Sequence, residues 1–177
     1  MHIFLQGPKK IGKSTVIRKT LDILTSDAQL RLGGFFTWNG GNDDPHIYMR
    51  PARSGKEDGA FRLASYDFVN GGIISNIQAF ELDGVRILAD HADAELIIMD
   101  ELGYLERNAP VFRRAVLDIL AGDIPVFGVL RQGDVPWHLE IKQNPLVTIF
   151  EVNEKNRDGL PLELAFRLAG IIQNNSQ

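Results

Sequence analysis

Apolar residues fall into four short continuous runs along the chain, and each run has the length of a buried strand. The runs cover residues 2–6, 95–99, 124–130 and 146–152. A strand that is covered on both faces needs apolar side chains at consecutive positions, as in a parallel sheet. The four runs therefore predict strands of a parallel sheet.

Between and after these runs, apolar residues recur every three or four positions, which is the spacing of a helix with one buried face. This spacing predicts helices over 17–24, 112–120 and 162–172. For the second of them, Asn108 is the candidate N-cap and Pro110 lies in the first turn. Strands that alternate with helices predict a three-layer α/β fold with a mostly parallel sheet.

A central stretch of the chain has a different pattern. Strand-like pieces at 34–38, 46–50 and 61–66 follow one another with no helical spacing between them. The residues that separate them, at 39–45 and 54–59, are rich in types that favour turns. Short turn-rich connections join antiparallel strands, so we expect an antiparallel insert here.

The composition is that of an ordinary globular domain. The chain has 177 residues, of which 44% are hydrophobic and 24% charged, and this length predicts one domain over residues 1–177. No apolar run reaches the roughly 18 residues of a membrane span, and the first residues are too few for a signal-peptide core. We therefore expect a cytoplasmic monomer with no membrane partner.

Two further properties of the composition exclude classes of site. The chain has no cysteine, which excludes disulfide frameworks, cysteine nucleophiles and thiolate zinc sites. Its formal net charge is −4, without a block of like charge, so binding to nucleic acid is not indicated.

A phosphate-binding pattern comes directly after the first predicted strand. The segment Gly7-Pro8-Lys9-Lys10-Ile11-Gly12-Lys13-Ser14 matches G-x-x-x-x-G-K-[ST] and continues into helical spacing. Glycines let backbone N–H groups wrap around phosphate oxygens, and the helix N-terminus favours negative charge. We predict that Lys13 reaches the β- and γ-phosphates and that Ser14 gives an oxygen ligand to Mg²⁺. Lys9 and Lys10 either strengthen the attraction for polyphosphate or are ordinary solvated lysines.

Two carboxylates stand at the end of the second apolar run. Asp100 is predicted to hold Mg²⁺, and Glu101 to orient and deprotonate a water molecule in line with the γ-phosphoryl group. Attack by water is hydrolysis, which yields a nucleoside diphosphate and phosphate. A buried strand can also end in acidic residues without any chemical role, so this prediction depends on the phosphate loop.

Three further segments give the chain a resemblance to a known family. They are Gly34–Thr37, Met99–Glu106, and Asn156–Asp158 followed by Leu160-Pro161. In this order and spacing, from Gly7 to Pro161, the chain resembles the cancer-related nucleoside-triphosphatase family of small P-loop phosphohydrolases. The resemblance implies a P-loop fold of additional-strand topology. It also implies Mg²⁺-dependent cleavage of nucleoside triphosphates such as ATP or GTP, with a loose choice of base.

The resemblance also implies site residues by position. Gly7 to Thr15 match the nucleotide loop of the family, Asp100 its Mg²⁺ residue and Glu101 its base. The late Asn-Arg-Asp element places Arg157 among the nucleotide-binding residues. The same three residue types after a strand are also typical of a plain turn, and both interpretations stay open.

The chain departs from the pattern of the family in three places. The usual Pro-Gly inside the loop is Lys9-Lys10, the usual basic residue after Glu-x-Gly is Tyr104, and the usual Gly-Lys-Tyr element is Gly71 to Ile74. Loss of the loop glycine is expected to alter loop flexibility and rate. The catalytic pair is retained.

Arg131 follows the predicted strand 124–130, which in this fold class lies between the phosphate-loop strand and the acidic strand. At that place an arginine senses the γ-phosphate or forms a plain surface ion pair. We expect Trp38 and Trp137 to pack in the core, with stacking on a base as the alternative. The four histidines share no metal-ligand spacing and have no assigned role. A solvated helix end is expected for Asp90, Asp93 and Glu95.

Two other functions stay open at this point. A phosphotransferase shares the loop but usually closes an arginine-rich lid over its acceptor. Residues 131–145 hold a single arginine, which argues against such a lid, although Arg113 and Arg114 lie elsewhere in the chain. The second alternative is a slow switch, in which nucleotide binding reshapes residues 33–66 for a partner.

Overall fold

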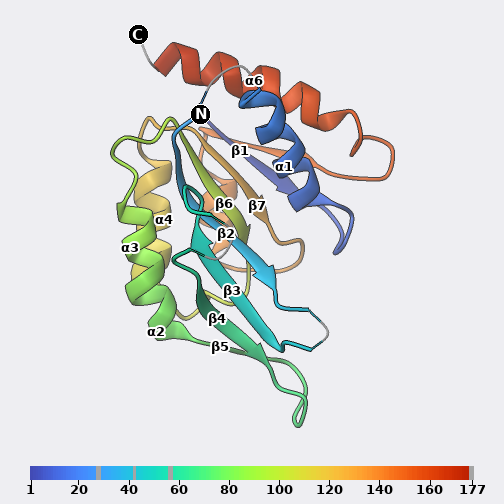
Figure 1. Ribbon diagram of the computed structural model, residues 1–177, viewed down its shortest axis with the longest axis vertical. Coiled ribbons are helices and arrows are strands. Elements are labelled where there is room, and N and C mark those ends of the chain that lie inside the picture. The colour runs from blue at the N-terminus through green and yellow to red at the C-terminus, as the bar shows by residue number, and fades with distance from the viewer. Residues whose placement is uncertain (27–28, 42, 56–57, 176–177) are drawn as a thin grey trace.

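One eight-stranded sheet runs through the protein in the order β5-β4-β3-β2-β6-β7-β1-β8 (Figure 1). The structure is a computed structural model that describes residues 1–26, 29–41, 43–55 and 58–175. Parts of the predicted turns 39–45 and 54–59 therefore lie outside the described residues. The strands are β1 (His2–Gln6), β2 (Leu32–Asn39), β3 (His46–Pro51), β4 (Phe61–Tyr66), β5 (Ile73–Ser75), β6 (Leu96–Leu102), β7 (Val126–Leu130) and β8 (Val147–Glu151).

The parallel part of the sheet contains the four strands predicted from continuous apolar runs. Strands β2, β6, β7, β1 and β8 all pair in parallel. Along β6, Leu96 and Ile98 pack in the core on one face, and Ile97 and Met99 in the core on the other. Burial on both faces is the reason for the unbroken apolar runs. Strand β7 lies between β1 and β6, as predicted.

The antiparallel insert is also confirmed. Strands β3, β4 and β5 extend the sheet beyond β2, and each pairs antiparallel with the strand before it. Strand β2 belongs to both parts, because it pairs in parallel with β6 and antiparallel with β3. The predicted fold class, a three-layer α/β fold with a mostly parallel sheet and an antiparallel insert, is correct.

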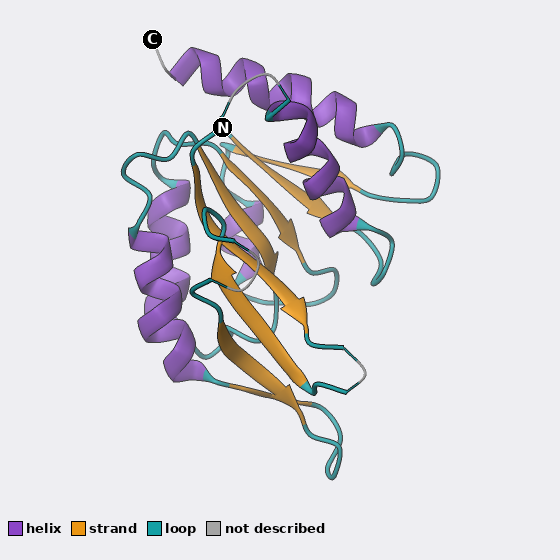
Figure 2. Ribbon diagram, viewed as in Figure 1, coloured by secondary structure: helices purple, strands orange, loops and turns teal. Residues whose placement is uncertain are grey.

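Helices cover both faces of the sheet (Figure 2). Helices α1 and α6 pack together on one face, and the succession α2, η1, α3 lies beside α4 on the other. In the described part of the chain, no helix is long and apolar enough to cross a membrane. The bounds are α1 (Lys13–Leu24), α2 (Ile77–Ala79), the π-helix η1 (Phe80–Gly84), α3 (Val85–Ala89), α4 (Pro110–Leu120), α5 (His138–Lys142) and α6 (Leu160–Asn175).

Two details of the helices differ from the prediction. The helices between 77 and 89, and α5, were not predicted. Each has only three to five residues, which is too short for helical spacing of apolar residues to be recognised beside the adjacent turn residues. The expected N-cap at Asn108 is wrong: Ala109 holds the cap position and no side chain caps the helix. Pro110 takes the first helical position, where its missing N–H leaves one donor fewer to satisfy.

Candidate active site

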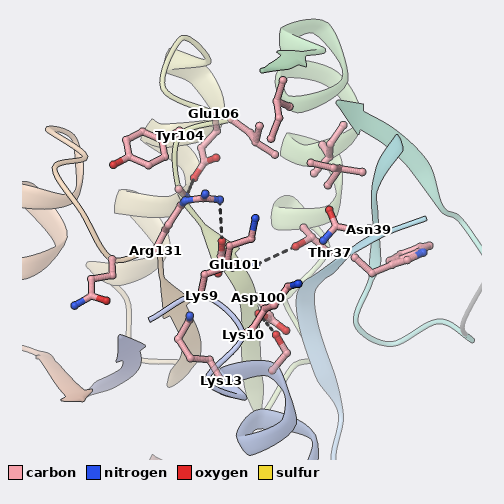
Figure 3. Close-up of a pocket in the computed structure, with 18 of the residues that line it drawn as sticks. Lys9, Lys10, Lys13, Thr37, Asn39, Asp100, Glu101, Tyr104, Glu106 and Arg131 are labelled. Atoms are coloured by element: carbon pink, nitrogen blue, oxygen red, sulfur yellow. Dashed lines mark hydrogen bonds and ion pairs between the residues drawn. The ribbon is translucent and has the colours of Figure 1, made fainter. Parts of the chain in front are cut away.

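A cavity of about 590 Å³ opens where β1, β6 and β7 end. The loop after β1, the last residues of β6 and the residues after β7 all line it (Figure 3). Parallel α/β sheets bind their ligands at this edge, because the carboxyl ends of the strands and the helix N-termini meet there.

Two glycines shape the loop between β1 and α1. At Gly7 (φ +156°), a Cβ atom would lie 2.5 Å from the carbonyl oxygen of Val152, so no side chain fits. Gly12 has φ +107° and stands at the N-cap of α1 without a capping side chain. The first turn of α1 also contains no acidic residue. Its N–H groups are therefore available to an anion in the cavity.

The ammonium group of Lys13 lies inside the curve of this loop. Its Nζ atom donates to the carbonyl oxygens of Gly7 and Pro8, each at 3.0 Å. The residue is 8% exposed, so its charge is largely shielded from solvent. A largely buried ammonium group held against the loop suits a polyphosphate.

Lys9 and Lys10 line the same cavity from its exposed rim. Lys10 has φ +66°, in the left-handed region that glycine adopts most readily. For a residue with a side chain this conformation costs about 1 kcal/mol. Lys9-Lys10 replaces the Pro-Gly that is usual in the family this chain resembles. Lys10 therefore keeps a backbone conformation typical of glycine although it is not a glycine.

The side chains of Ser14, on α1, and Asp100, on β6, are in contact at the wall of the cavity. The Ser14 hydroxyl donates to Oδ1 of Asp100 at 3.2 Å. Burial raises the pKa of Asp100 to about 7, although the hydrogen bond from Ser14 acts in the opposite direction. A hydroxyl and a carboxylate at this separation provide the hard oxygen ligands that Mg²⁺ prefers. The two residues therefore fit a magnesium site that also includes phosphate oxygens.

Glu101 is fixed from two sides. Its backbone N–H donates to Oγ1 of Thr37 on β2, at 3.2 Å. Its Oε1 atom lies 3.6 Å from Nη1 of Arg131, and both side chains are about a third exposed. An ion pair with this exposure adds little stability, but it orients the carboxylate toward the cavity. Thr37 belongs to a segment of the resemblance, yet its hydrogen bond to this residue was not predicted.

The loop after β6 is held by a second buried carboxylate that the sequence analysis did not assign. Glu106 accepts a hydrogen bond from the N–H of Gly103, and Trp137 Nε1 donates to the Gly103 carbonyl at 3.0 Å. Burial raises the pKa of Glu106 to about 7. The Arg131 guanidinium lies 5.3 Å from the centroid of the Tyr104 ring. The only sequence signal for Glu106 was its place in the run after the acidic strand.

Arg157 does not reach this cavity. It is exposed, it is absent from the lining, and its backbone N–H donates to the Asn153 carbonyl. The Asn156 side chain donates to a backbone carbonyl at the end of β8, as turn residues do. Pro8 and Ile11 shape the loop but do not line the cavity either.

The two tryptophans have different environments. Trp137 is 4% exposed, which confirms its predicted place in the core. Trp38 is half-buried, stacks on Tyr48 with ring centroids 5.4 Å apart, and lines the cavity. Its predicted core position is wrong, because β3 supplies an aromatic partner on the open face of β2.

The acidic residues after α3 form surface ion pairs. Arg53 pairs with Asp90 and Asp93, and Arg31 pairs with Glu95. Among the residues that the structure describes, no group of three or more His, Cys, Asp or Glu side chains is arranged to hold a metal ion.

The sequence matches proteins of one family along most of its length. The profile of the family described as NTPase matches residues 2–165. Nucleoside-triphosphatase THEP1 of Thermotoga petrophila is 31% identical over 171 residues, which are 95% of this chain and 93% of the relative. The cancer-related nucleoside-triphosphatase homolog of Mus musculus is 26% identical over 179 residues, which are 90% of this chain and 92% of the relative.

Solved structures share the fold. The crystal structure of THEP1 from Aquifex aeolicus matches with a TM-score of 0.76 at 24% identity, over 95% of this chain and 99% of that one. The solution structure of a human cancer-related nucleoside triphosphatase matches with a TM-score of 0.74 at 23% identity, over 94% and 96%.

Proposed function

Because the chain belongs to the NTPase family, whose profile covers residues 2–165, we propose that it hydrolyses nucleoside triphosphates with Mg²⁺ and little selectivity for the base. Its relatives in bacteria, archaea and mouse carry the name nucleoside-triphosphatase. The resemblance to the cancer-related nucleoside triphosphatases is thereby confirmed.

One juxtaposition supports the proposal more than any other. Residues that are distant in the sequence, Ser14 and Asp100, hydrogen bond in the cavity beside the ammonium group of Lys13. Glu101 follows at once and lines the same cavity. An anion site, an oxygen pair for a metal and a second carboxylate are the parts that phosphoanhydride hydrolysis requires.

The proposed mechanism assigns one task to each group. The loop N–H groups and Lys13 hold the β- and γ-phosphates. Ser14 and Asp100 would hold Mg²⁺, which when bound neutralises charge on the phosphate oxygens. Glu101 accepts a proton from water while the water oxygen bonds to the γ-phosphorus. The bond from that phosphorus to the bridging oxygen breaks, and the diphosphate leaves.

Arg131 supports the base in this scheme. Its ion pair with Glu101 fixes the carboxylate, and its position after β7 places positive charge beside the phosphate loop. Contact of Arg157 with the phosphates or the base remains a prediction, because this exposed residue lies outside the cavity lining. All the proposed groups come from one chain, so a monomer is sufficient for the chemistry.

The loose base choice follows from what surrounds the loop. The lining near the phosphates consists of Gly7, Lys9, Lys10 and residues 12–15. These groups recognise phosphate charge and present no set of donors and acceptors matched to one base. We therefore expect similar turnover of ATP, GTP, CTP and UTP.

The test is phosphate release from these four triphosphates, each with Mg²⁺ and with a chelator. We expect release of all four within about a factor of ten, and loss of release with the chelator. Glu101→Gln should lower kcat about a hundredfold or more, in the range for loss of a general base, and leave nucleotide binding intact. The matched control is Glu163→Gln, an exposed residue of α6 outside the cavity.

Two results would contradict the proposal. If Glu101→Gln turned over like the control variant, Glu101 would not be the base. If the wild type bound nucleotide tightly but released phosphate no faster than the uncatalysed reaction, the slow switch would be the better description.

A further inference from the structure

One part of this cavity lies between the antiparallel insert and η1, and we call it the insert chamber. Figure 3 shows Thr37 and Asn39 of β2 on the side of Asp100 and Glu101 away from Lys13. The walls of the chamber come from β3, β4, β5 and η1. They are formed by Ile47, Leu63, Tyr66, Ile73 and Phe80.

The chamber lies on the side of the γ-phosphoryl group that a nucleophile must approach, an assignment that depends on the proposed function. The phosphate loop follows β1, whereas β2 flanks the acidic strand β6 on its other edge. A triphosphate held by the loop thus presents its γ-phosphorus to Glu101 with the chamber behind that residue. In-line displacement requires the nucleophile opposite the leaving diphosphate. A molecule in the chamber is therefore on the attacking side.

The walls are suited to a neutral, mainly apolar molecule. Leu63 and Phe80 are 1% and 2% exposed, so they are built into the core. These wall residues carry no charge. The charged residues that line the same cavity come from the phosphate loop and the start of α1, from β6 and the loop after it, and from the residue after β7. A phosphate-bearing acceptor would lose its hydration here without gaining a counter-charge, which is unfavourable.

Two polar contacts border the chamber, one at its exposed mouth and one beside Glu101. The Tyr66 hydroxyl donates to Oδ1 of Asn39 at 3.1 Å, and Thr37 Oγ1 accepts from the Glu101 N–H. Glu101 itself faces the same space. A few polar groups beside an apolar surface fix the orientation of a small ligand and turn its polar end toward them.

From this arrangement we propose that the insert chamber binds a neutral aromatic alcohol and that the protein transfers the γ-phosphoryl group to its hydroxyl. The hydroxyl oxygen bonds to the γ-phosphorus while the bond to the bridging oxygen breaks. Glu101 accepts the hydroxyl proton, and the products are a phosphomonoester and a nucleoside diphosphate. Hydrolysis is the same displacement with water in place of the alcohol.

Strand β5 offers a matched pair of variants. Ile73 lines the chamber and is 39% exposed, whereas its neighbour Ile74 is 60% exposed and absent from the lining. Both lie on the edge strand of the sheet, so a polar substitution at either is expected to fold. Ile73→Asp puts a charge in the chamber, Ile73→Trp fills it, and Ile74→Asp alters only the opposite face of the strand.

The experiment uses the intact protein with Mg²⁺ and γ-labelled ATP. Benzyl alcohol and 2-phenylethanol serve as acceptors, and glycerol and AMP as polar and charged comparisons. Thin-layer chromatography separates labelled ester from labelled phosphate. Saturation-transfer NMR with a nonhydrolysable ATP analogue measures binding of the alcohols, and titration of that analogue measures nucleotide affinity.

We expect ester from the aromatic alcohols at least tenfold above that from glycerol or AMP. Ile73→Asp and Ile73→Trp should each lower ester formation and alcohol binding tenfold or more, and Ile74→Asp should stay within twofold of wild type. If no aromatic alcohol bound or accepted label while phosphate release persisted, the chamber proposal would be overturned and the hydrolase proposal would stand.

Two further results would also count against the chamber. If the Ile73 variants weakened binding of the ATP analogue tenfold and Ile74→Asp did not, the nucleobase would occupy the chamber. If wild type neither released phosphate nor transferred label to any acceptor, the hydrolase proposal and the chamber proposal would both be overturned.

Discussion

The two ends of the cavity are built from different materials. The nucleotide end is lined by Gly7, Lys9, Lys10 and residues 12–15, which lie close together in the sequence. The insert chamber consists of mainly apolar side chains spread from 47 to 80 over three strands and a π-helix. Backbone amides recognise phosphate through local conformation, whereas the shape of an apolar chamber depends on packing between distant elements. Charge and backbone therefore dominate one end, and side-chain volume the other.

The largest effect should come from removing charge at the nucleotide end. Lys13→Ala leaves the loop amides without the ammonium group that Gly7 and Pro8 now hold in place. We expect kcat/KM for ATP to fall about a thousandfold, near the upper end for loss of one charge-stabilising group. Lys19→Ala, an exposed residue of the same helix, is the control. If kcat/KM fell equally in both variants, the substitutions would have disturbed the helix. If it did not fall in Lys13→Ala, the site would be wrongly assigned.

Truncation of a buried side chain should destabilise the protein less at the chamber than in the closed core. Leu5 lies in β1 among buried core residues, and Leu63 lies in β4 where it lines the chamber; both are 1% exposed or less. Leu5→Ala should lower the free energy of unfolding by about 4 kcal/mol, because it leaves a closed cavity. Leu63→Ala should cost about 2 kcal/mol, since water can enter the enlarged chamber. Urea unfolding measures both, and equal values would mean that the chamber is closed in solution.

The same difference explains which features could be predicted from sequence. The phosphate loop, the acidic end of β6 and the four buried strands all have local patterns, and the structure shows each of these elements. The alternation of β3 and β4 with turns predicted the antiparallel insert. These features depend on neighbouring residues, so a window of ten positions contains most of the information.

The rest of the cavity has no such local pattern. Trp38 was predicted to pack in the core because a large aromatic side chain usually does, but its neighbours come from β3, which a sequence does not place. Phe80 belongs to a π-helix that interrupts the helical spacing between 77 and 89. Glu106 became visible as a site residue only when its contacts with Gly103 were known. Tertiary packing determines all three.

Glu106 lies in the loop after β6 and lines the cavity, and the pH dependence of stability tests whether water reaches its carboxyl group. Burial raises its pKa from 4.5 to about 7. The folded state therefore favours the protonated carboxyl, and stability falls as pH rises from about 4.5 to 7. Glu106→Gln keeps an oxygen for Gly103 but cannot ionise, so its stability relative to wild type should rise by about 2.5 kcal/mol between pH 5 and pH 8. Urea unfolding at both pH values measures this gain.

The control for that experiment is Glu140→Gln, an exposed residue of α5. It should show the same pH dependence as wild type. If the stability of Glu106→Gln depended on pH as that of the control does, water would reach the Glu106 carboxyl group in solution.

The smallest predicted effect is a difference in stability between glycine substitutions at two adjacent lysines of the loop. Lys10 has φ +66°, whereas Lys9 does not have positive φ. Lys10→Gly removes the unfavourable left-handed conformation of a residue with a side chain, which offsets the added freedom of the unfolded chain. We expect it to raise the free energy of unfolding by about 0.5 kcal/mol, whereas Lys9→Gly should lower it by about 0.5–1 kcal/mol. Each variant removes one positive charge from the rim, so a difference of sign between them isolates the backbone conformation from the charge. If both variants changed the midpoint of thermal unfolding by the same amount, the loss of charge alone would account for their effect on stability.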